Sequence, residues 1–96
     1  MPKGYIIARV SVSDPDAYAK YAALARVAMD RFGARILARG GRHTALEGEA
    51  RPRNVILEFA SYDRALEYWN SPEYQEARSH RIGAAEIELC AVEGTG

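Results

Sequence analysis

Two arginines in residues 71–81 stand where a helix would carry apolar side chains. Steps of about 100° per residue place Arg78 and Arg81 on the same side of a helix as Tyr74 and Ile82. A guanidinium group stays charged and needs acceptors for its N–H groups. An inward-facing pair of arginines therefore predicts either an internal ion pair or a site for an anionic oxygen.

The structural interpretation needs carboxylates near these arginines. Glu58 and Glu86 alternate with apolar residues in two segments that we expect to be strands. Arg78 and Arg81 would pair with these carboxylates, or with carbonyl groups at a helix end, and fasten the helix to the sheet. The choice of carboxylate depends on the strand register.

The functional interpretation places one of the arginines beside a cavity. Arg78 would bind a ligand carboxylate or enolate through paired hydrogen bonds, and Trp69 and Tyr74 would form an aromatic wall beside it. The alternative for both aromatic residues is a purely structural place in the core, which is the commoner role of large aromatic side chains at helical spacing.

A second set of candidates surrounds the glycine pair 40–41, where we expect a bend or bulge. Arg39 precedes the bend, and we expect it on the uncovered face of the sheet with Arg9 and Glu58. There it would hold a ligand anion, while His43 or Glu58 would move a proton. The alternatives are an interfacial network between these arginines and a partner chain, and a surface position for His43.

Composition limits the classes of partner. The chain has 96 residues, of which 48% are hydrophobic, and this predicts one globular domain over residues 1–96. Thirteen basic residues balance thirteen acidic ones without a basic stripe, so we expect no nucleic-acid partner. No apolar run approaches the roughly 20 residues of a membrane span, so we expect a soluble cytoplasmic protein.

Neither a cofactor nor a metal is indicated by the sequence. No paired-histidine ligand spacing and no serine nucleophile motif is present. Cys90, the single cysteine, lies in an apolar segment, and we expect it to be a small buried side chain without a catalytic partner.

The periodicity of the apolar residues predicts the order βαββαβ. Strands are expected at residues 5–12, 35–39, 55–60 and 86–92, with an extended continuation of the second strand at 43–49. Helices are expected at residues 14–32 and 61–69, with a break and a second helical piece from residue 71.

This order predicts a ferredoxin-like α+β fold, in which a four-stranded antiparallel sheet carries its helices on one face. The other face is uncovered in a monomer. We therefore expect a homodimer whose subunits pack through this open sheet face, forming a dimeric α+β barrel.

Several short motifs together resemble one family. They are Tyr5-Ile6-Ile7-Ala8, Ala38-Arg39-Gly40-Gly41, Leu46-Glu47-Gly48, Val55-Ile56-Leu57-Glu58-Phe59 and Trp69-Asn70-Ser71-Pro72-Glu73-Tyr74, followed by Arg78 and Arg81. The combination spans nearly the whole chain and resembles the small bacterial family of domains of unknown function numbered thirteen-thirty. The resemblance implies membership of the dimeric α+β barrel superfamily.

That superfamily includes cofactor-independent monooxygenases, muconolactone isomerase-like proteins, haem-dependent chlorite dismutases and stress-responsive proteins, so the resemblance implies a fold and not one reaction. Two hypotheses follow. The first is binding or cofactor-free conversion of a small organic anion, with a carboxylate or enolisable oxygen, in a pocket of the barrel. The second is a non-enzymatic stress-response or interaction module whose charged interior only specifies the dimer.

Overall fold

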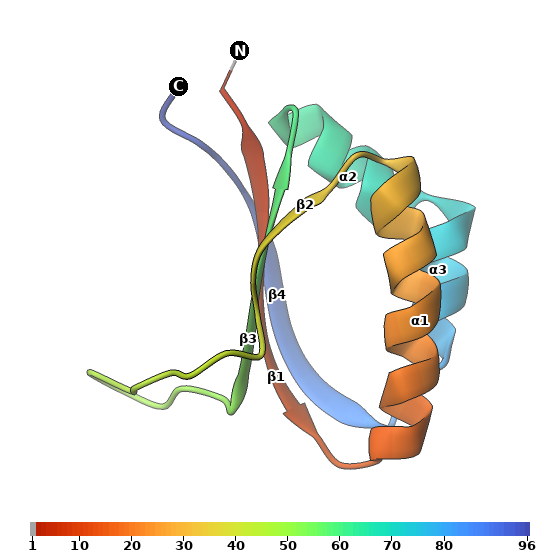
Figure 1. Cartoon of the computed structure of the whole chain (residues 1–96), viewed down its shortest axis with the longest axis vertical. Helices are drawn as coiled ribbons and strands as arrows, with labels where there is room; N and C mark the ends of the chain where they lie inside the picture. The colour runs from red at the N-terminus through yellow and green to blue at the C-terminus, as the bar shows by residue number, and fades with distance from the viewer. Residues whose placement is uncertain (1) are drawn as a thin grey trace.

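The computed structural model describes residues 2–96 as a four-stranded antiparallel sheet with three helices on one face (Figure 1). The elements are β1 (Gly4–Val12), α1 (Pro15–Arg31), β2 (Arg35–Arg39), β3 (Arg53–Phe59), α2 (Tyr62–Asn70), α3 (Pro72–Ser79) and β4 (Ala85–Glu93). The strand order is β2-β3-β1-β4, with β1 antiparallel to both of its neighbours. The ferredoxin-like α+β fold expected from the sequence is confirmed.

Capping side chains set the helix boundaries. Asp14 accepts a hydrogen bond from the first turn of α1, and Ser61 does the same for α2. Ser71 accepts from the Tyr74 N–H at 3.1 Å and donates to the Tyr68 carbonyl at 2.7 Å. One serine thus ends α2 and begins α3, which confirms the predicted helix break.

The core lies between the helices and the inner face of the sheet. Alternation along the strands turns every second side chain toward the helices, and the buried strand residues are Ile6, Ala8, Val10, Val55, Leu57 and Phe59. The sheet is approached most closely by α2, whereas α1 packs mainly against α3. The backbone of α1 therefore lies farther from the sheet than that of α2 does.

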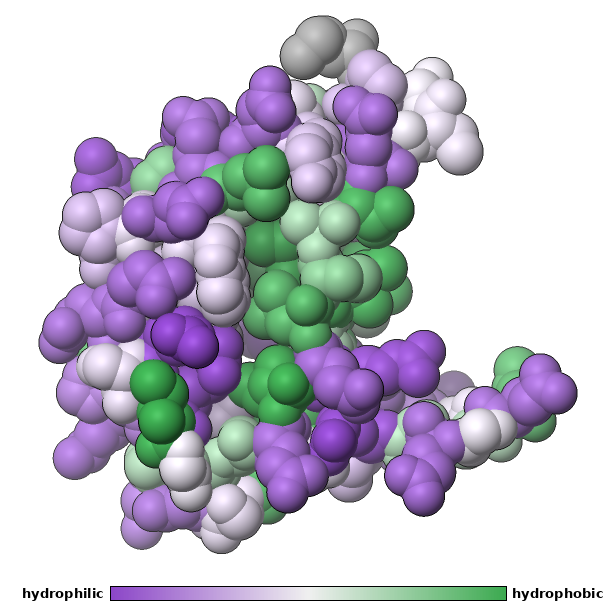
Figure 2. All heavy atoms as spheres, turned by 180° about the vertical axis from the view of Figure 1, so that it is seen from behind, coloured by the Kyte–Doolittle hydropathy of each residue, from purple (hydrophilic) through white to green (hydrophobic). Residues whose placement is uncertain are grey.

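The strand register arranges the side chains of the uncovered face in rows. A central row is apolar and consists of Ala38, Ile56, Ile7 and Cys90. The two flanking rows carry charges: Arg35, Glu58, Tyr5 and Val92 on one side, and Asn54, Arg9 and Glu88 on the other. Figure 2 shows a mostly polar helical side and apolar side chains gathered toward the sheet.

Cys90 belongs to this uncovered face and is exposed. Ile87 and Leu89 on the same strand are partly buried and pack against the core. Because neighbouring strand residues point to opposite faces, Cys90 must point outward. The expectation of a buried cysteine is therefore wrong.

Residues 40–52, which we call the arm, project from the sheet on the side away from the helices (Figure 1). Residues 43–49 are all described by the structure and form no strand, so the expected extension of β2 is wrong. Leu46 within the arm is 93% exposed.

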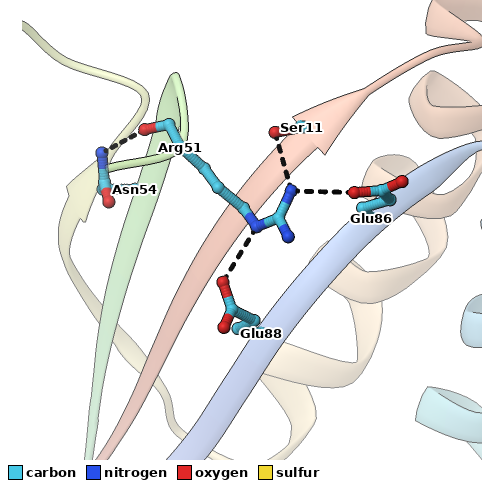
Figure 3. Close-up of polar contacts among 5 residues, drawn as sticks. All are labelled: Ser11, Arg51, Asn54, Glu86 and Glu88. Carbon is cyan, nitrogen blue, oxygen red and sulfur yellow. Dashed lines mark hydrogen bonds and ion pairs between the residues drawn. The ribbon is translucent and has the colours of Figure 1, made fainter. Parts of the chain in front are cut away.

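Arg51 ties the base of the arm to the sheet. Its guanidinium group donates to Glu88 at 3.0 Å, to Glu86 at 3.2 Å and to the Ser11 hydroxyl at 3.0 Å (Figure 3). The hydrogen bonds to Glu88 and Glu86 raise the pKa of Arg51. Both glutamates are largely exposed, so these ion pairs stabilise the arm only modestly.

None of the helices within residues 2–96 is both long enough and apolar enough to cross a membrane.

Gly4 provides a test of how closely β1 approaches the start of α2. A Cβ atom at Gly4 would lie 2.6 Å from the carbonyl carbon of Ser61 and 2.6 Å from the Cα atom of Tyr62. Because backbone atoms cannot move aside cheaply, we expect Gly4→Ala to lower the free energy of unfolding by about 2–3 kcal/mol or more. Urea denaturation measures this change.

Gly41→Ala is the matched control, because a Cβ atom there meets nothing within 4 Å. We expect this variant to unfold within about 0.5 kcal/mol of the original protein. Equal stability of the two variants would contradict the close packing of β1 on α2.

Candidate functional site

A cavity of about 390 Å³ lies between the helices and the inner face of the sheet. Apolar side chains of the sheet line one side. Five aromatic residues of the three helices also line it: Tyr18, Tyr21, Tyr68, Trp69 and Tyr74. Arg39 and Arg53 are the charged residues of the lining. The size and the mainly apolar wall are typical of a small-molecule site.

The break between α2 and α3 assembles the aromatic wall. Tyr68 and Trp69 lie in the last turn of α2, and Tyr74 lies in the first turn of α3. The ring centroids of Tyr68 and Trp69 come within 4.7 Å and 5.3 Å of that of Tyr74. Tyr21 from α1 meets the Tyr74 ring edge-on at 6.1 Å. Such tilted and edge-on arrangements are favourable for aromatic rings.

Arg39 lines this cavity and not the uncovered face, so the face predicted for it is wrong. Strict alternation from Arg35, which pairs with Glu58, would turn Arg39 outward. The register shifts between Ile36 and Ala38, and Arg39 pairs with the buried Val55. This β-bulge re-aims the Arg39 side chain toward the helical side.

Arg53 was not among the site residues predicted from the sequence, but it lines the same cavity. Its guanidinium carbon lies 5.5 Å from the centroid of the Tyr18 ring, and its buried Nε finds no hydrogen-bond partner within residues 2–96. Arg53 stands two residues before the buried Val55, so alternation along β3 turns both side chains to the inner face. This alternation was the signal that could have identified Arg53.

Gly40 makes room for Arg53. Its φ angle is +65°, and a Cβ atom there would lie 2.8 Å from Nη1 of Arg53. The positive φ angle favours glycine at this position, and the missing side chain leaves the guanidinium group of Arg53 its place.

Arg81 is buried, as the helical wheel predicted, at 8% exposure. Its Nη2 donates to the Tyr74 hydroxyl at 3.3 Å, and its guanidinium carbon lies 5.2 Å from the centroid of the Tyr21 ring. Ile82 is 65% exposed, against the prediction, because α3 ends at Ser79 and the helical wheel no longer applies.

Arg78 lies over Trp69, with 5.4 Å between the guanidinium carbon and the ring centroid. A long contact of 3.5 Å joins its Nη1 to the Gln75 side-chain oxygen. Arg78 is not among the residues that line the cavity, whereas the other three predicted ligand-binding residues are: Arg39, Trp69 and Tyr74.

The predicted ion pairs of Arg78 and Arg81 with Glu58 or Glu86 are wrong. In the part of the chain that the structure describes, neither arginine lies within ion-pair distance of a carboxylate. Glu58 accepts from the Tyr5 hydroxyl at 3.0 Å and Glu86 pairs with Arg51. The register places both glutamates on the uncovered face, across the sheet from the helices.

The two residues predicted to move a proton are not brought to the cavity. Glu58 lies on the uncovered face, and His43 is exposed in the arm. No His, Asp, Glu or Cys occurs among the described residues that line the cavity. The same part of the chain contains no group of three His, Cys, Asp or Glu side chains that could hold a metal ion.

Burial and hydrogen bonding set the protonation states of the tyrosine and arginine side chains around the cavity. Removal from water raises the pKa of Tyr21 and of Tyr68 far above their ordinary value, so both remain neutral hydroxyl donors. Burial by itself would lower the pKa of Arg81, but the hydrogen bond to Tyr74 and the phenol groups of Tyr74 and Tyr21 leave it raised. Arg81 thus stays charged.

The chain was compared with protein-family models and with curated proteins. A family model described as a domain of unknown function (DUF1330) matches residues 3–95. A search of curated proteins finds no match.

Solved structures share the fold at low sequence identity. A protein of unknown function from Rhodopseudomonas palustris is 22% identical, with a TM-score of 0.78 over 99% of this chain and 84% of that one. SnoaB from Streptomyces nogalater, described as a cofactor-independent oxygenase, is 12% identical, with a TM-score of 0.62 over 100% and 96% of the two chains. A dimeric ferredoxin-like protein from Thermobifida fusca is 12% identical, with a TM-score of 0.57 over 96% and 91%.

The buried phenols predict an alkaline limit to stability. Tyr21 and Tyr68 ionise in the unfolded chain near the ordinary pKa of 10.0 but stay protonated in the folded one. The folded protein then binds more protons, so its free energy of unfolding is unaffected by these groups below pH 10 and falls above it. The expected fall is about 1.4 kcal/mol per pH unit for each phenol.

Tyrosinate absorbance and circular dichroism, followed together during an alkaline titration, measure this behaviour. We expect Tyr21→Phe to remove one phenol that ionises only on unfolding, and Tyr62→Phe to serve as the control outside the cavity. Reversible ionisation of all six tyrosines with the fold intact would contradict the burial of the cluster.

Proposed function

Because the chain belongs to the family of domains of unknown function DUF1330, whose description names no reaction, we propose a function from the cavity itself. The protein binds a small organic anion with a flat apolar body between its helices and its sheet, and needs no cofactor to do so. The carboxylate or enolate of the ligand would meet Arg39 and Arg53, and its body would lie against the aromatic wall.

The observation that carries the proposal is a pair of arginines without carboxylate partners in an otherwise apolar wall. Neither Arg39 nor Arg53 forms an ion pair within residues 2–96. An unpaired guanidinium group at the edge of an apolar cavity strongly favours an anionic oxygen, because paired N–H donors match a carboxylate. Aromatic rings supply the apolar contact.

Conversion of the ligand would have to rely on the ligand's own acidity. No carboxylate, imidazole or thiol lines the cavity in the described chain, so an enolate or phenolate would form with solvent as base and be stabilised by the guanidinium groups. The structural similarity to SnoaB, a cofactor-independent oxygenase, supports cofactor-free chemistry as the reaction class to test. Binding without turnover is the simpler form of the same proposal.

A thermal-shift titration with benzoate and its neutral counterpart benzamide tests the proposal. We expect saturable stabilisation by benzoate and none by benzamide, because only the acid offers a charge to the arginines. Arg53→Gln and Arg39→Gln should each weaken benzoate binding by about tenfold or more, since each removes charge-assisted hydrogen bonds.

Arg26→Gln is the matched control, since Arg26 pairs with Asp30 on the exposed surface of α1. This variant should bind benzoate as the original protein does. Equal responses to benzoate and benzamide, or unchanged affinity in both cavity variants, would overturn the proposal.

The uncovered face supports a second proposal, that of a homodimer. Its apolar row flanked by charged rows is suited to a self-complementary interface, in which Arg9 and Arg35 of one copy meet Glu58 and Glu88 of the other. Similarity in fold to a dimeric ferredoxin-like protein agrees with it. If no ligand binds, this face and the arm would make the chain an interaction module.

Ile7 lies at the centre of the apolar row, between Ile56 and Cys90. We expect sedimentation equilibrium to give a dimer for the original protein and a folded monomer for Ile7→Glu, because a buried unpaired charge opposes association. Ile82→Glu, at an exposed position after α3, is the control and should remain dimeric. A monomeric original protein at micromolar concentration would refute the interface.

A further inference from the structure

The hydroxyl groups of Tyr21 and Tyr74 leave one hydrogen without an acceptor. Their oxygens lie 3.0 Å apart, so one hydroxyl donates to the other. Tyr74 also accepts a hydrogen bond from Arg81. Because a guanidinium group only donates, this contact gives neither hydroxyl hydrogen an acceptor. The pair holds two hydrogens and uses one, and no other hydrogen bond within residues 2–96 takes the second. One phenolic donor therefore remains free.

A buried positive charge stands behind this donor. Arg81 is 8% exposed and forms no ion pair with the described residues, and its Nε has no hydrogen-bond partner there. Leaving a buried cation without an anion is costly. Its hydrogen bond to Tyr74 polarises the hydroxyl pair and strengthens the free O–H as a donor.

Both rings of the pair line the cavity whose wall also contains Arg39 and Arg53. The two sets come from different elements: Tyr21 and Tyr74 lie on α1 and α3, and the two arginines lie on β2 and β3. Arg81 is not among the lining residues and acts through Tyr74, so it is a positioning residue. The cavity thus presents two groups of donors within one apolar wall.

We propose that the ligand of this cavity is an aromatic carboxylate that carries a second oxygen, either a phenolic hydroxyl or a keto group able to form an enolate. The inference rests on the proposed function, which assigns the carboxylate to Arg39 and Arg53. The second oxygen accepts the free hydrogen of the Tyr21–Tyr74 pair. Arg81, behind the pair, favours the anionic form of that oxygen.

Matched ligands separate this inference from the proposed function. Isothermal titration compares benzoate with 3-hydroxybenzoate, 4-hydroxybenzoate and phenylpyruvate. We expect at least one oxygen-bearing ligand to bind about tenfold more tightly than benzoate, the gain typical of a charge-assisted hydrogen bond. Arg39→Gln should weaken benzoate and the favoured ligand by the same factor.

The double variant Tyr21→Phe/Tyr74→Phe keeps both rings and removes both hydroxyl groups. We expect it to lose the preference for the second oxygen, measured as the ratio of the two ligands' affinities in the same variant, so that any change in benzoate binding itself cancels. Single variants are less decisive, because either hydroxyl alone still provides a donor. Tyr68→Phe removes a hydroxyl in the same cavity that is not hydrogen-bonded to Arg81, and it should lower the preference less than the double variant does.

A chromophoric ligand tests the role of Arg81. 4-Hydroxy-3-nitrobenzoate changes its visible absorbance when its phenol ionises. We expect the phenol of the bound probe to ionise at a lower pH than that of the free probe, and Arg81→Gln to abolish this shift. If Arg81→Gln does not fold, the pH at which the bound probe ionises is measured in Tyr21→Phe/Tyr74→Phe instead. Loss of the shift in that variant is then the expected result.

The outcomes separate clearly. If benzoate binds but no second oxygen adds affinity, or if the double variant keeps the preference, the inference is overturned and the proposed function stands. A larger effect of Tyr68→Phe than of the double variant also overturns it. If no carboxylate binds at all, the proposed function and this inference fail together.

Discussion

Ser71 is the residue on which the helical layer depends. Its hydroxyl group joins the last turn of α2 to the first turn of α3, by donating to one and accepting from the other. The side chain is 5% exposed, so water does not compete for these bonds. Because the chain turns here, Tyr68 and Tyr74 face each other across the break, and the turn after α3 buries Arg81 behind them. A continuous helix would have separated these residues along its axis.

Strand parity keeps three carboxylates of the sheet away from the arginines of its inner face. Carboxylates at Glu58, Glu86 and Glu88 all lie on the uncovered face, whereas Arg39 and Arg53 lie on the inner one. Arg53 and Arg81 are therefore left with aromatic faces as neighbours, and Arg81 also with a phenol oxygen. Cation–π contacts offset part of the cost of burial but leave N–H groups without acceptors.

Periodicity and capping were sufficient to predict the elements and their order. Asp14, Ser61 and Ser71 are short-range signals whose meaning does not depend on distant contacts. The inward position of Tyr74 also follows from spacing within a helix, whereas Arg81 is buried by the turn that follows α3. The fold was thus accessible from local chemistry, together with the family resemblance.

Features that depend on pairing between strands were not accessible. A one-residue bulge in β2 reverses the face of Arg39, and nothing local to that strand besides the following glycines signals it. The partners of Arg78 and Arg81 depended on register, and the sequence offered carboxylates that lie across the sheet. Arg53 could have been found from parity on β3, but the strand expected over residues 55–60 left it outside.

Gly40 contributes to the cavity although it does not line it. The guanidinium group of Arg53 lies beside the space that the missing side chain of Gly40 leaves, so the backbone at the start of the arm bounds the place of a cation that belongs to β3. Residue 40 is therefore a position from which protein engineering could shift the charged end of the cavity, and with it the length of ligand accepted, while every lining residue stays unchanged.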